Sequence, residues 1–162
     1  MNEICYHPIG VVRSPFKTPK GTPIQPAGSV DTRGTVELLP EYAEGLQDLE
    51  GFSHIILLYH FHKAKEPAMK VKPFMDDREH GIFAQRAPSR PNPIGLSIVR
   101  LEKIEGNILY LKDVDLLDGT PLLDIKPYVP EFDIRQVTRT GWLEQNVHKL
   151  KKARDDERFA KT

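Results

Sequence analysis

The sequence from Leu96 to Leu117 reads LSIVRLEKIEGNILYLKDVDLL. Two runs rich in branched apolar residues flank the short turn Glu105-Gly106-Asn107. Apolar, β-branched runs on either side of a glycine-containing turn are typical of a β-hairpin. The sequence therefore predicts two antiparallel strands, over Leu96 to Lys103 and Ile108 to Leu117.

Further short strands are predicted on both sides of this hairpin. The run Ile55 to Tyr59 is apolar on both faces and is expected to form a central strand that continues through His60 to His62. Strands are also expected over Ile4 to Ser14, Val30 to Leu38 and Leu122 to Tyr128, and the turn Asp118 to Pro121 precedes the last of them. Some six or seven short strands with closely spaced turns favour a small antiparallel β-barrel.

Two helices complete the expected fold. Pro40 begins a short helix whose apolar residues Tyr42, Leu46 and Leu49 share a face, and Gly51 closes it. From Trp142 onward the apolar spacing predicts a C-terminal helix. The predicted class is mainly β, with residues 1–140 forming the barrel and residues 141–162 a helical tail.

Composition excludes several classes of protein. The 162 residues contain 23 basic and 23 acidic side chains, so the net charge is zero and the chain is no general polycation. A single cysteine rules out a disulfide framework and a cysteine-rich zinc site. We expect a soluble cytoplasmic protein, because no apolar run is long enough to cross a membrane and the first residues do not resemble a signal peptide.

The stretch from Gly81 to Ser97 is a proline-rich loop with two arginines, Arg86 and Arg90, and no acidic residue. Its prolines exclude a helix and stiffen the backbone. Two guanidinium groups on a stiff loop suit a planar anion such as a carboxylate or phosphate. The alternative is a surface crossover whose arginines are simply solvated. The glycine-rich signatures of Rossmann and phosphate-loop nucleotide sites are missing from the sequence, so this loop is the best candidate for a ligand site.

Three polar residues share one face of the last predicted strand. Asp124, Lys126 and Tyr128 recur at period two directly after a tight turn. A carboxylate, an ammonium and a phenol together can transfer a proton and bind an anion. The competing interpretation is an ordinary solvent-facing surface with a weak ion pair.

Two other groups of residues carry weaker signals. His60 and His62 share a strand face, and with Glu66 they form a possible metal-ligand set of the kind that cupin barrels use. A structural or ligand-contacting histidine pair is the alternative. The basic side chains of the predicted C-terminal helix either follow a phosphate backbone or are solvated.

Several segments together resemble one family. They are residues 9–15, the sequence Gly51-Phe52-Ser53-His54, the Gly81 to Ser97 block, and Leu117 to Pro121 with Asp124 to Tyr128. This set resembles the TsaA-like or TrmO-type family of tRNA methyltransferases, which act on N-threonylcarbamoyladenosine next to the anticodon. The resemblance implies a β-barrel enzyme that uses S-adenosylmethionine, binds tRNA and forms a homodimer with the cofactor near the subunit interface.

The resemblance also implies which residues contact the cofactor. The matching positions are Ile24, Gln25, Pro26, Phe61, His62, Arg86, Leu96, Asp118, Gly119, Thr120 and Pro121. Arg86 suits the methionine carboxylate of the cofactor, and Phe61 suits its adenine or sulfonium.

The expected chemistry assigns roles to the remaining polar residues. The acceptor nitrogen lies between a purine and a carbamoyl carbonyl, so it becomes a good nucleophile only when it loses its proton. We expect Asp124 to act as the base, with Lys126 and Tyr128 orienting either Asp124 or the carbamoyl oxygen. Arg90 or Asn92 is expected to contact the threonyl carboxylate. Two alternatives remain: a metal-dependent cupin-like enzyme, and a non-catalytic module that binds RNA or a small ligand.

Overall fold

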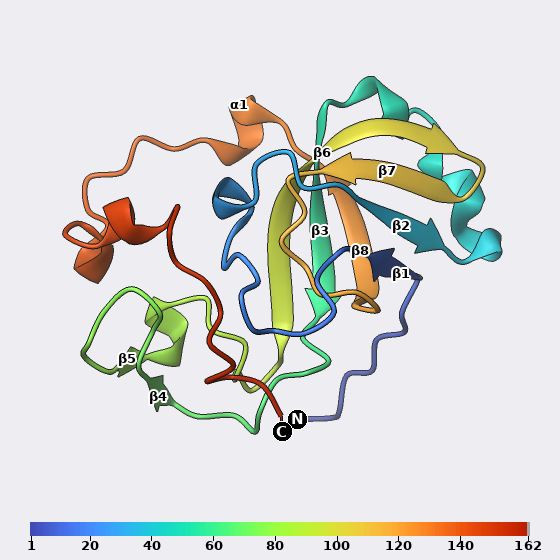
Figure 1. Ribbon diagram of the computed structural model, residues 1–162. Helices are drawn as coiled ribbons and strands as arrows, with labels where there is room; N and C mark the ends of the chain where they lie inside the picture. The colour runs from blue at the N-terminus through green and yellow to red at the C-terminus, as the bar shows by residue number, and fades with distance from the viewer. Residues whose placement is uncertain (162) are drawn as a thin grey trace.

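A computed structural model describes residues 1–161 of the chain, and its centre is a closed antiparallel barrel (Figure 1). Its six strands are arranged in the order β1-β2-β7-β6-β3-β8. Their bounds are Gly10–Arg13 (β1), Gly34–Leu38 (β2), His54–His60 (β3), Ile94–Glu105 (β6), Ile108–Lys112 (β7) and Pro121–Pro127 (β8). The predicted mainly-β barrel is confirmed. Within residues 1–161, no helix combines the length and apolar character that spanning a membrane requires.

The predicted hairpin is the longest element of the barrel. Strands β6 and β7 pair from Glu105 and Ile108 back to Arg100 and Lys112. Gly106 connects them with φ of 62°, a left-handed conformation that glycine adopts without steric cost. A register shift between Leu101 and Lys103 bends β6, so the same strand can pair with β7 at one end and with β3 along the rest of its length.

The core of the barrel is made of inward-facing strand residues. Alternate positions of β3 and of the first half of β6 are buried, and eight aliphatic side chains on the barrel strands are fully buried: Val12, Val36, Ile55, Leu57, Val99, Leu109, Leu111 and Leu122. Each such side chain contributes about 1.5–3 kcal/mol relative to an exposed position. Closure of the sheet satisfies the backbone groups that an open edge would leave exposed.

The helical predictions need correction. Pro40–Leu46 and Leu49–Gly51 are separate 3-10 helices, because Asp48 between them has a left-handed φ of 66°. In the C-terminal segment, the predicted helix is replaced by two short 3-10 helices, Gly141–Leu143 and Val147–Lys149. Its apolar residues Leu143, Val147 and Leu150 line a cavity and do not belong to the barrel core. A short helix needs a packed apolar stripe to be stable. The α-helix that residues 1–161 do contain, α1, spans Pro130–Asp133.

Strand β8 departs from the simple alternation expected for it. The register with β3 shifts between Leu58 and Tyr59, opposite residues 122–124. Leu122 therefore enters the core, and Ile125 packs against the core three positions later. Simple alternation would place Leu123 and Ile125 on one face, but a β-bulge adds one residue to the period of this strand.

Segments outside the barrel cover one side of it. The two-residue strands β4 (Lys70–Val71) and β5 (His80–Gly81) form a small hairpin that ends where the proline-rich loop begins. Residues 141–161, called the C-terminal strap below, run past this hairpin (red in Figure 1). The strap forms isolated bridges at two points, Arg154 to Pro23 and Ala160 to Ala64. Phe159 anchors it in a small second core with Ile82 and Ala87.

Candidate functional site

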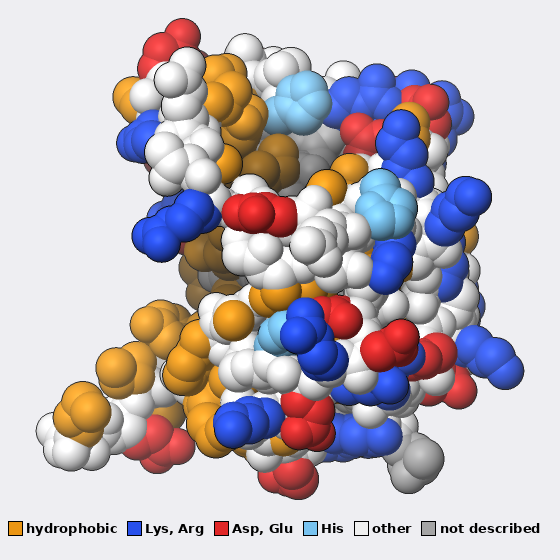
Figure 2. Space-filling view, turned by 90° about the vertical axis from the view of Figure 1, so that its left-hand side faces the viewer, with side chains coloured by type: hydrophobic (Ala, Val, Ile, Leu, Met, Phe, Trp, Pro, Cys, Tyr) orange, Lys and Arg blue, Asp and Glu red, His pale blue; other side chains and the backbone are white. Residues whose placement is uncertain are grey.

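A cavity of about 960 Å³ lies among the barrel, the proline-rich loop and the C-terminal strap. Three kinds of segment line it: Leu96 and Ile98 from β6, Arg86 from the loop, and Trp142 and Leu150 from the strap. Figure 2 shows a hollowed face on which hydrophobic side chains are surrounded by charged groups of both signs. A volume near the upper end of the 300–1,000 Å³ typical of small-molecule sites leaves room for a nucleotide-sized ligand.

Most of the predicted ligand residues meet in this cavity. Its lining includes Ile24, Gln25, Pro26, Phe61, His62, Arg86, Arg90, Leu96 and Thr120. Arg86 donates from Nη1 to Oε1 of Gln25 over 3.1 Å, joining segments 61 residues apart. Phe61 packs edge-on against Tyr59 with ring centroids 5.3 Å apart. Burial, with Lys63 and His60 nearby, lowers the pKa of His62, which favours a neutral imidazole at neutral pH.

Arg90 holds the proline-rich loop in shape. Its Nη1 donates to the backbone carbonyls of Ile82 and Gln85 at 3.0 and 2.8 Å. Gln85 in turn donates to the carbonyls of Val71 and His80, which ties the loop to the β4–β5 hairpin. Backbone carbonyls with no helix or sheet partner need such donors. The two arginines that looked alike in the sequence therefore differ: Arg86 is exposed beside the cavity, and Arg90 is half-buried within the loop.

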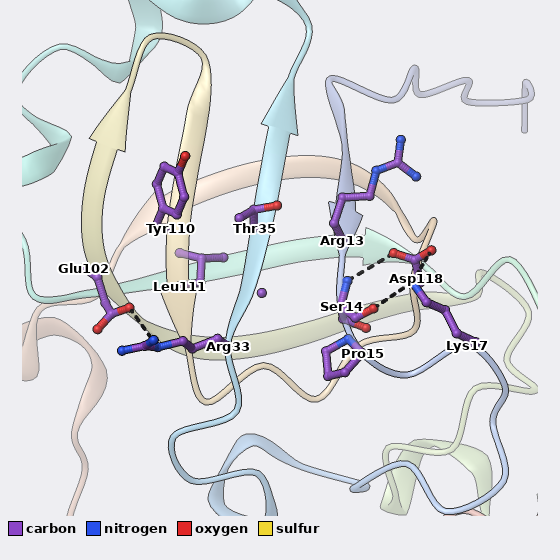
Figure 3. Close-up of a pocket in the computed structure, with 11 residues that line it drawn as sticks. Arg13, Ser14, Pro15, Lys17, Arg33, Thr35, Glu102, Tyr110, Leu111 and Asp118 are labelled. Atoms are coloured by element: carbon purple, nitrogen blue, oxygen red, sulfur yellow. Dashed lines mark hydrogen bonds and ion pairs between the residues drawn. The ribbon is translucent and has the colours of Figure 1, made fainter.

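The turn before β8 contributes less to the cavity than expected. Only Thr120 of the four predicted turn residues lines it. Asp118 instead accepts a hydrogen bond from the Ser14 backbone at 3.1 Å and pairs with Lys17 at 3.0 Å. These contacts border a second pocket of about 530 Å³, outside the strands β1, β2 and β7 (Figure 3). Gly119, at φ of 78°, and Pro121 shape the turn outside the cavity lining.

The polar face predicted on β8 also lies outside the cavity lining. Asp124 pairs with Lys126 at 2.8 Å, and their side chains are 46% and 58% exposed. Tyr128 follows the end of β8, with its ring beside His54. Asn92 is exposed on the proline-rich loop and likewise lies outside the lining. These four residues therefore do not belong to the cavity lining that most of the predicted cofactor contacts share.

Three cavity-side polar residues escaped the sequence-based prediction. Tyr59 on β3 and Asp115 after β7 line the cavity, and Ser97 on β6 lies between them. Burial raises the pKa of Asp115 to about 7, against the lowering effect of its hydrogen bond from Ser97. The available signal was a single acid within the apolar run Val114-Asp115-Leu116-Leu117. For Ser97, strand alternation predicts only which face of β6 it lies on and gives no sign of a polar partner.

The metal-site alternative finds no support in the geometry. Among residues 1–161, no three His, Cys, Asp or Glu side chains gather closely enough to hold a metal ion, and His60, His62 and Glu66 are no exception. His62 instead lines the cavity, as the ligand-contacting interpretation of the pair expects.

Comparison with protein families agrees with this arrangement. The family model of the tRNA-methyltransferase O N-terminal domain matches residues 11–134, which include all six barrel strands except the first residue of β1. The chain belongs to the tRNA-methyltransferase O family. The resemblance found in the sequence is thereby confirmed.

Individual members of the family differ in length. A protein of Pyrococcus abyssi named "probable S-adenosyl-L-methionine-binding protein" is 65% identical over 96% of this chain and 85% of its own. A human tRNA (adenine(37)-N6)-methyltransferase is 40% identical over 80% of this chain, which corresponds to 31% of the human protein. A crystal structure of TrmO from Pseudomonas aeruginosa superposes with a TM-score of 0.73 at 44% identity, over 87% of this chain and 63% of that one.

Proposed function

We propose that the protein is an S-adenosylmethionine-dependent tRNA methyltransferase that methylates the exocyclic nitrogen of N-threonylcarbamoyladenosine next to the anticodon. One observation carries the proposal. Five segments that the family resemblance assigns to the cofactor converge on one cavity: residues 24–26, residues 61–62, Arg86, Leu96 and Thr120. The name of the human relative, which specifies position 37 and N6 of adenine, supports the tRNA part of the proposal.

The residues of the cavity fit the proposed cofactor. Arg86 offers a guanidinium for its carboxylate, and Gln25 holds that guanidinium over 3.1 Å. Phe61 and Leu96 offer apolar surface for an adenine ring. When bound, S-adenosylmethionine supplies a methyl group activated by a sulfonium.

The protein's own contribution is alignment and exclusion of water. Methyl transfer is a direct displacement, so positioning of the acceptor and a dry site account for most of the catalysis a protein can offer. Trp142, Leu143 and Phe159 of the C-terminal strap supply an apolar wall over the cavity. Arg90 keeps the loop in place by binding its carbonyls. Asn92, exposed on the same loop, is the proposed contact for the threonyl carboxylate.

The proposal includes a homodimer in the cytoplasm, where tRNA is modified. If Lys126 and Tyr128 orient the substrate, the substrate must reach the exposed end of β8 as well as the cavity. Light scattering on the purified chain measures the oligomeric state, and a mass of one 18.5 kDa chain contradicts the dimer.

The decisive experiment incubates the protein with methyl-labelled S-adenosylmethionine and tRNA, with and without the threonylcarbamoyl modification. We expect label only in the modified tRNA. Label in both tRNAs would support methyltransferase activity but contradict the assignment of N-threonylcarbamoyladenosine as the substrate. Binding of the labelled compound without transfer to either tRNA would favour a non-catalytic binding module.

A further inference from the structure

Two strands and the segment after β7 bring a phenol, a hydroxyl and a carboxylate together beside the cavity. The oxygen of Tyr59 lies 3.0 Å from Oγ of Ser97, and Ser97 donates to Oδ1 of Asp115 over 2.7 Å. A serine hydroxyl has a single proton. Since Ser97 gives that proton to Asp115, Tyr59 must donate to Ser97. The hydrogen bonds therefore run in one direction and end on the carboxylate.

The fold holds this chain of groups rigidly. Ser97 is 1% exposed and Tyr59 is 7% exposed. Val114 and Leu116, on either side of Asp115, are both buried in the barrel core and fix the backbone between them. Asp115 and Tyr59 also line the cavity together with Arg86 and Leu96. The carboxylate is thus placed at the wall where the proposed cofactor contacts meet.

The electrostatics suit a group that exchanges a proton near neutral pH. Burial raises the pKa of Asp115 to about 7, and the hydrogen bond from Ser97 limits that rise. Burial and the nearby charge of Asp115 raise the pKa of Tyr59, so Tyr59 remains a donor. The other titratable or charged groups that face the cavity are His62, Lys63, Arg86, Arg90 and Asp155.

Resting on the proposed function, we propose that Asp115 is the base that takes the proton from the acceptor nitrogen, and that Ser97 and Tyr59 are positioning residues. The nitrogen–carbon bond forms as the carbon–sulfur bond of the sulfonium breaks. The nitrogen's proton passes to the carboxylate, which leaves a neutral carboxylic acid, a thioether and a methylated nitrogen. Asp124, the base expected from strand periodicity, is paired with Lys126 outside the cavity lining.

The first test compares Asp115→Asn, Asp124→Asn and the wild type in single-turnover methylation of modified tRNA at saturating cofactor. Loss of a general base costs about 10²–10⁴-fold, so we expect the rate of Asp115→Asn at pH 8 to fall at least about 100-fold. The cofactor affinity of Asp115→Asn, measured by calorimetry, is expected to stay within about threefold of the wild-type value. Asp77→Asn, a fully exposed carboxylate, serves as the matched control.

The second test uses a signal that does not depend on turnover. In ligand-free protein with ¹³C-labelled aspartate, the carboxyl resonance that Asp115→Asn removes should titrate near pH 7. Ser97→Ala removes the hydrogen bond that lowers the pKa of Asp115, so it should move that titration to higher pH. The rising limb of the pH–rate profile should move by the same amount, whereas a purely structural role for Ser97 would lower the rate at every pH equally.

Several outcomes overturn the assignment. The assignment fails if the methylation rate of Asp115→Asn is within a few-fold of the wild-type rate. It also fails if Asp115→Asn loses cofactor affinity by the same factor as its rate, because Asp115 would then be a cofactor ligand. Loss of activity in Asp124→Asn alone would return the role to Asp124. If the wild type methylates no tRNA, the proposed function fails; if it does and Asp115→Asn matches it, only the base assignment fails.

Discussion

Gly95 on β6 leaves no room for a side chain. A Cβ at this position would overlap the ring of Tyr59 and lie 2.8 Å from Phe61. These two aromatic rings connect the barrel interior to the cavity, since Tyr59 binds Ser97 and Phe61 lines the site. The glycine therefore sets the position of the Tyr59 hydroxyl.

Gly95→Ala is expected to displace the Tyr59 ring and to destabilise the fold. Overpacking in a well-filled interior costs about 1–3 kcal/mol, which for a chain of this size lowers Tm by roughly 2–12 °C. Calorimetry measures the shift. Gly45→Ala is the matched control, because its Cβ would meet no atom of the described chain within 4 Å. An unchanged Tm for Gly95→Ala would show that the rings can move aside freely.

The raised pKa of Asp115 also makes stability depend on pH. Its folded pKa of about 7 lies above the ordinary value of 3.8, so the folded state binds more protons between these values. Wild-type stability should therefore fall as pH rises from 4 to 7. Asp115→Asn removes this penalty, which is at most about 4 kcal/mol above pH 7.

Urea unfolding at pH 4, 6 and 8 measures this difference between wild type and Asp115→Asn. We expect similar stability at pH 4 and a more stable variant at pH 8. A difference that does not change with pH would contradict the burial of an ionisable carboxyl at this position.

Arg86 is the cavity residue whose loss should affect the cofactor most directly. Hydrogen bonds to charged groups contribute about 1.5–3 kcal/mol, so Arg86→Ala is expected to weaken S-adenosylmethionine binding roughly 10- to 100-fold. Isothermal titration gives the Kd. Arg33→Ala is the control, since Arg33 borders the smaller pocket. Equal affinity for Arg86→Ala and wild type would place the methionine carboxylate elsewhere.

The C-terminal strap is the element that was predicted least well. Its apolar spacing matched a helix, but its residues instead span the gap between barrel and loop. Trp142 donates to the carbonyl of Ala84 over 2.8 Å and stacks on His80 with centroids 4.7 Å apart. Local periodicity cannot reveal such partners, because they lie about 60 residues away in the chain.

Trp142→Ala is expected to loosen the strap and open the cavity. A loss of about 1–2 kcal/mol would raise the cofactor Kd about 5- to 30-fold and would make residues 141–161 more sensitive to protease. Phe132→Ala on α1 is the control, because Phe132 is 70% exposed. If the protease sensitivity of the strap and the cofactor Kd are both unchanged in Trp142→Ala, the position of the strap does not depend on the contact of Trp142 with Ala84 and His80.

Over the whole molecule, equal numbers of basic and acidic residues mean that any tRNA site must be a local patch. Lys151 and Lys152 are exposed on the strap, directly after the cavity-lining Leu150. If the strap meets the phosphate backbone, Lys151→Glu with Lys152→Glu should weaken tRNA binding and reduce the slope of log affinity against log salt by about 2.

Filter binding at several salt concentrations measures that slope. Lys103→Glu is the control, because Lys103 is paired with Glu105 at the β6–β7 hairpin. A slope unchanged by the strap substitutions but reduced by the control would place the tRNA on the opposite end of the barrel.

The sequence by itself determined the barrel, because strand periodicity and turn glycines such as Gly106 act between near neighbours. The family resemblance also named several residues that line the cavity, among them Gln25, Arg86 and Thr120. Only the tertiary structure decided the proton chain of Tyr59, Ser97 and Asp115. It joins three separate segments, and the pKa of its carboxyl depends on burial, which no local pattern encodes.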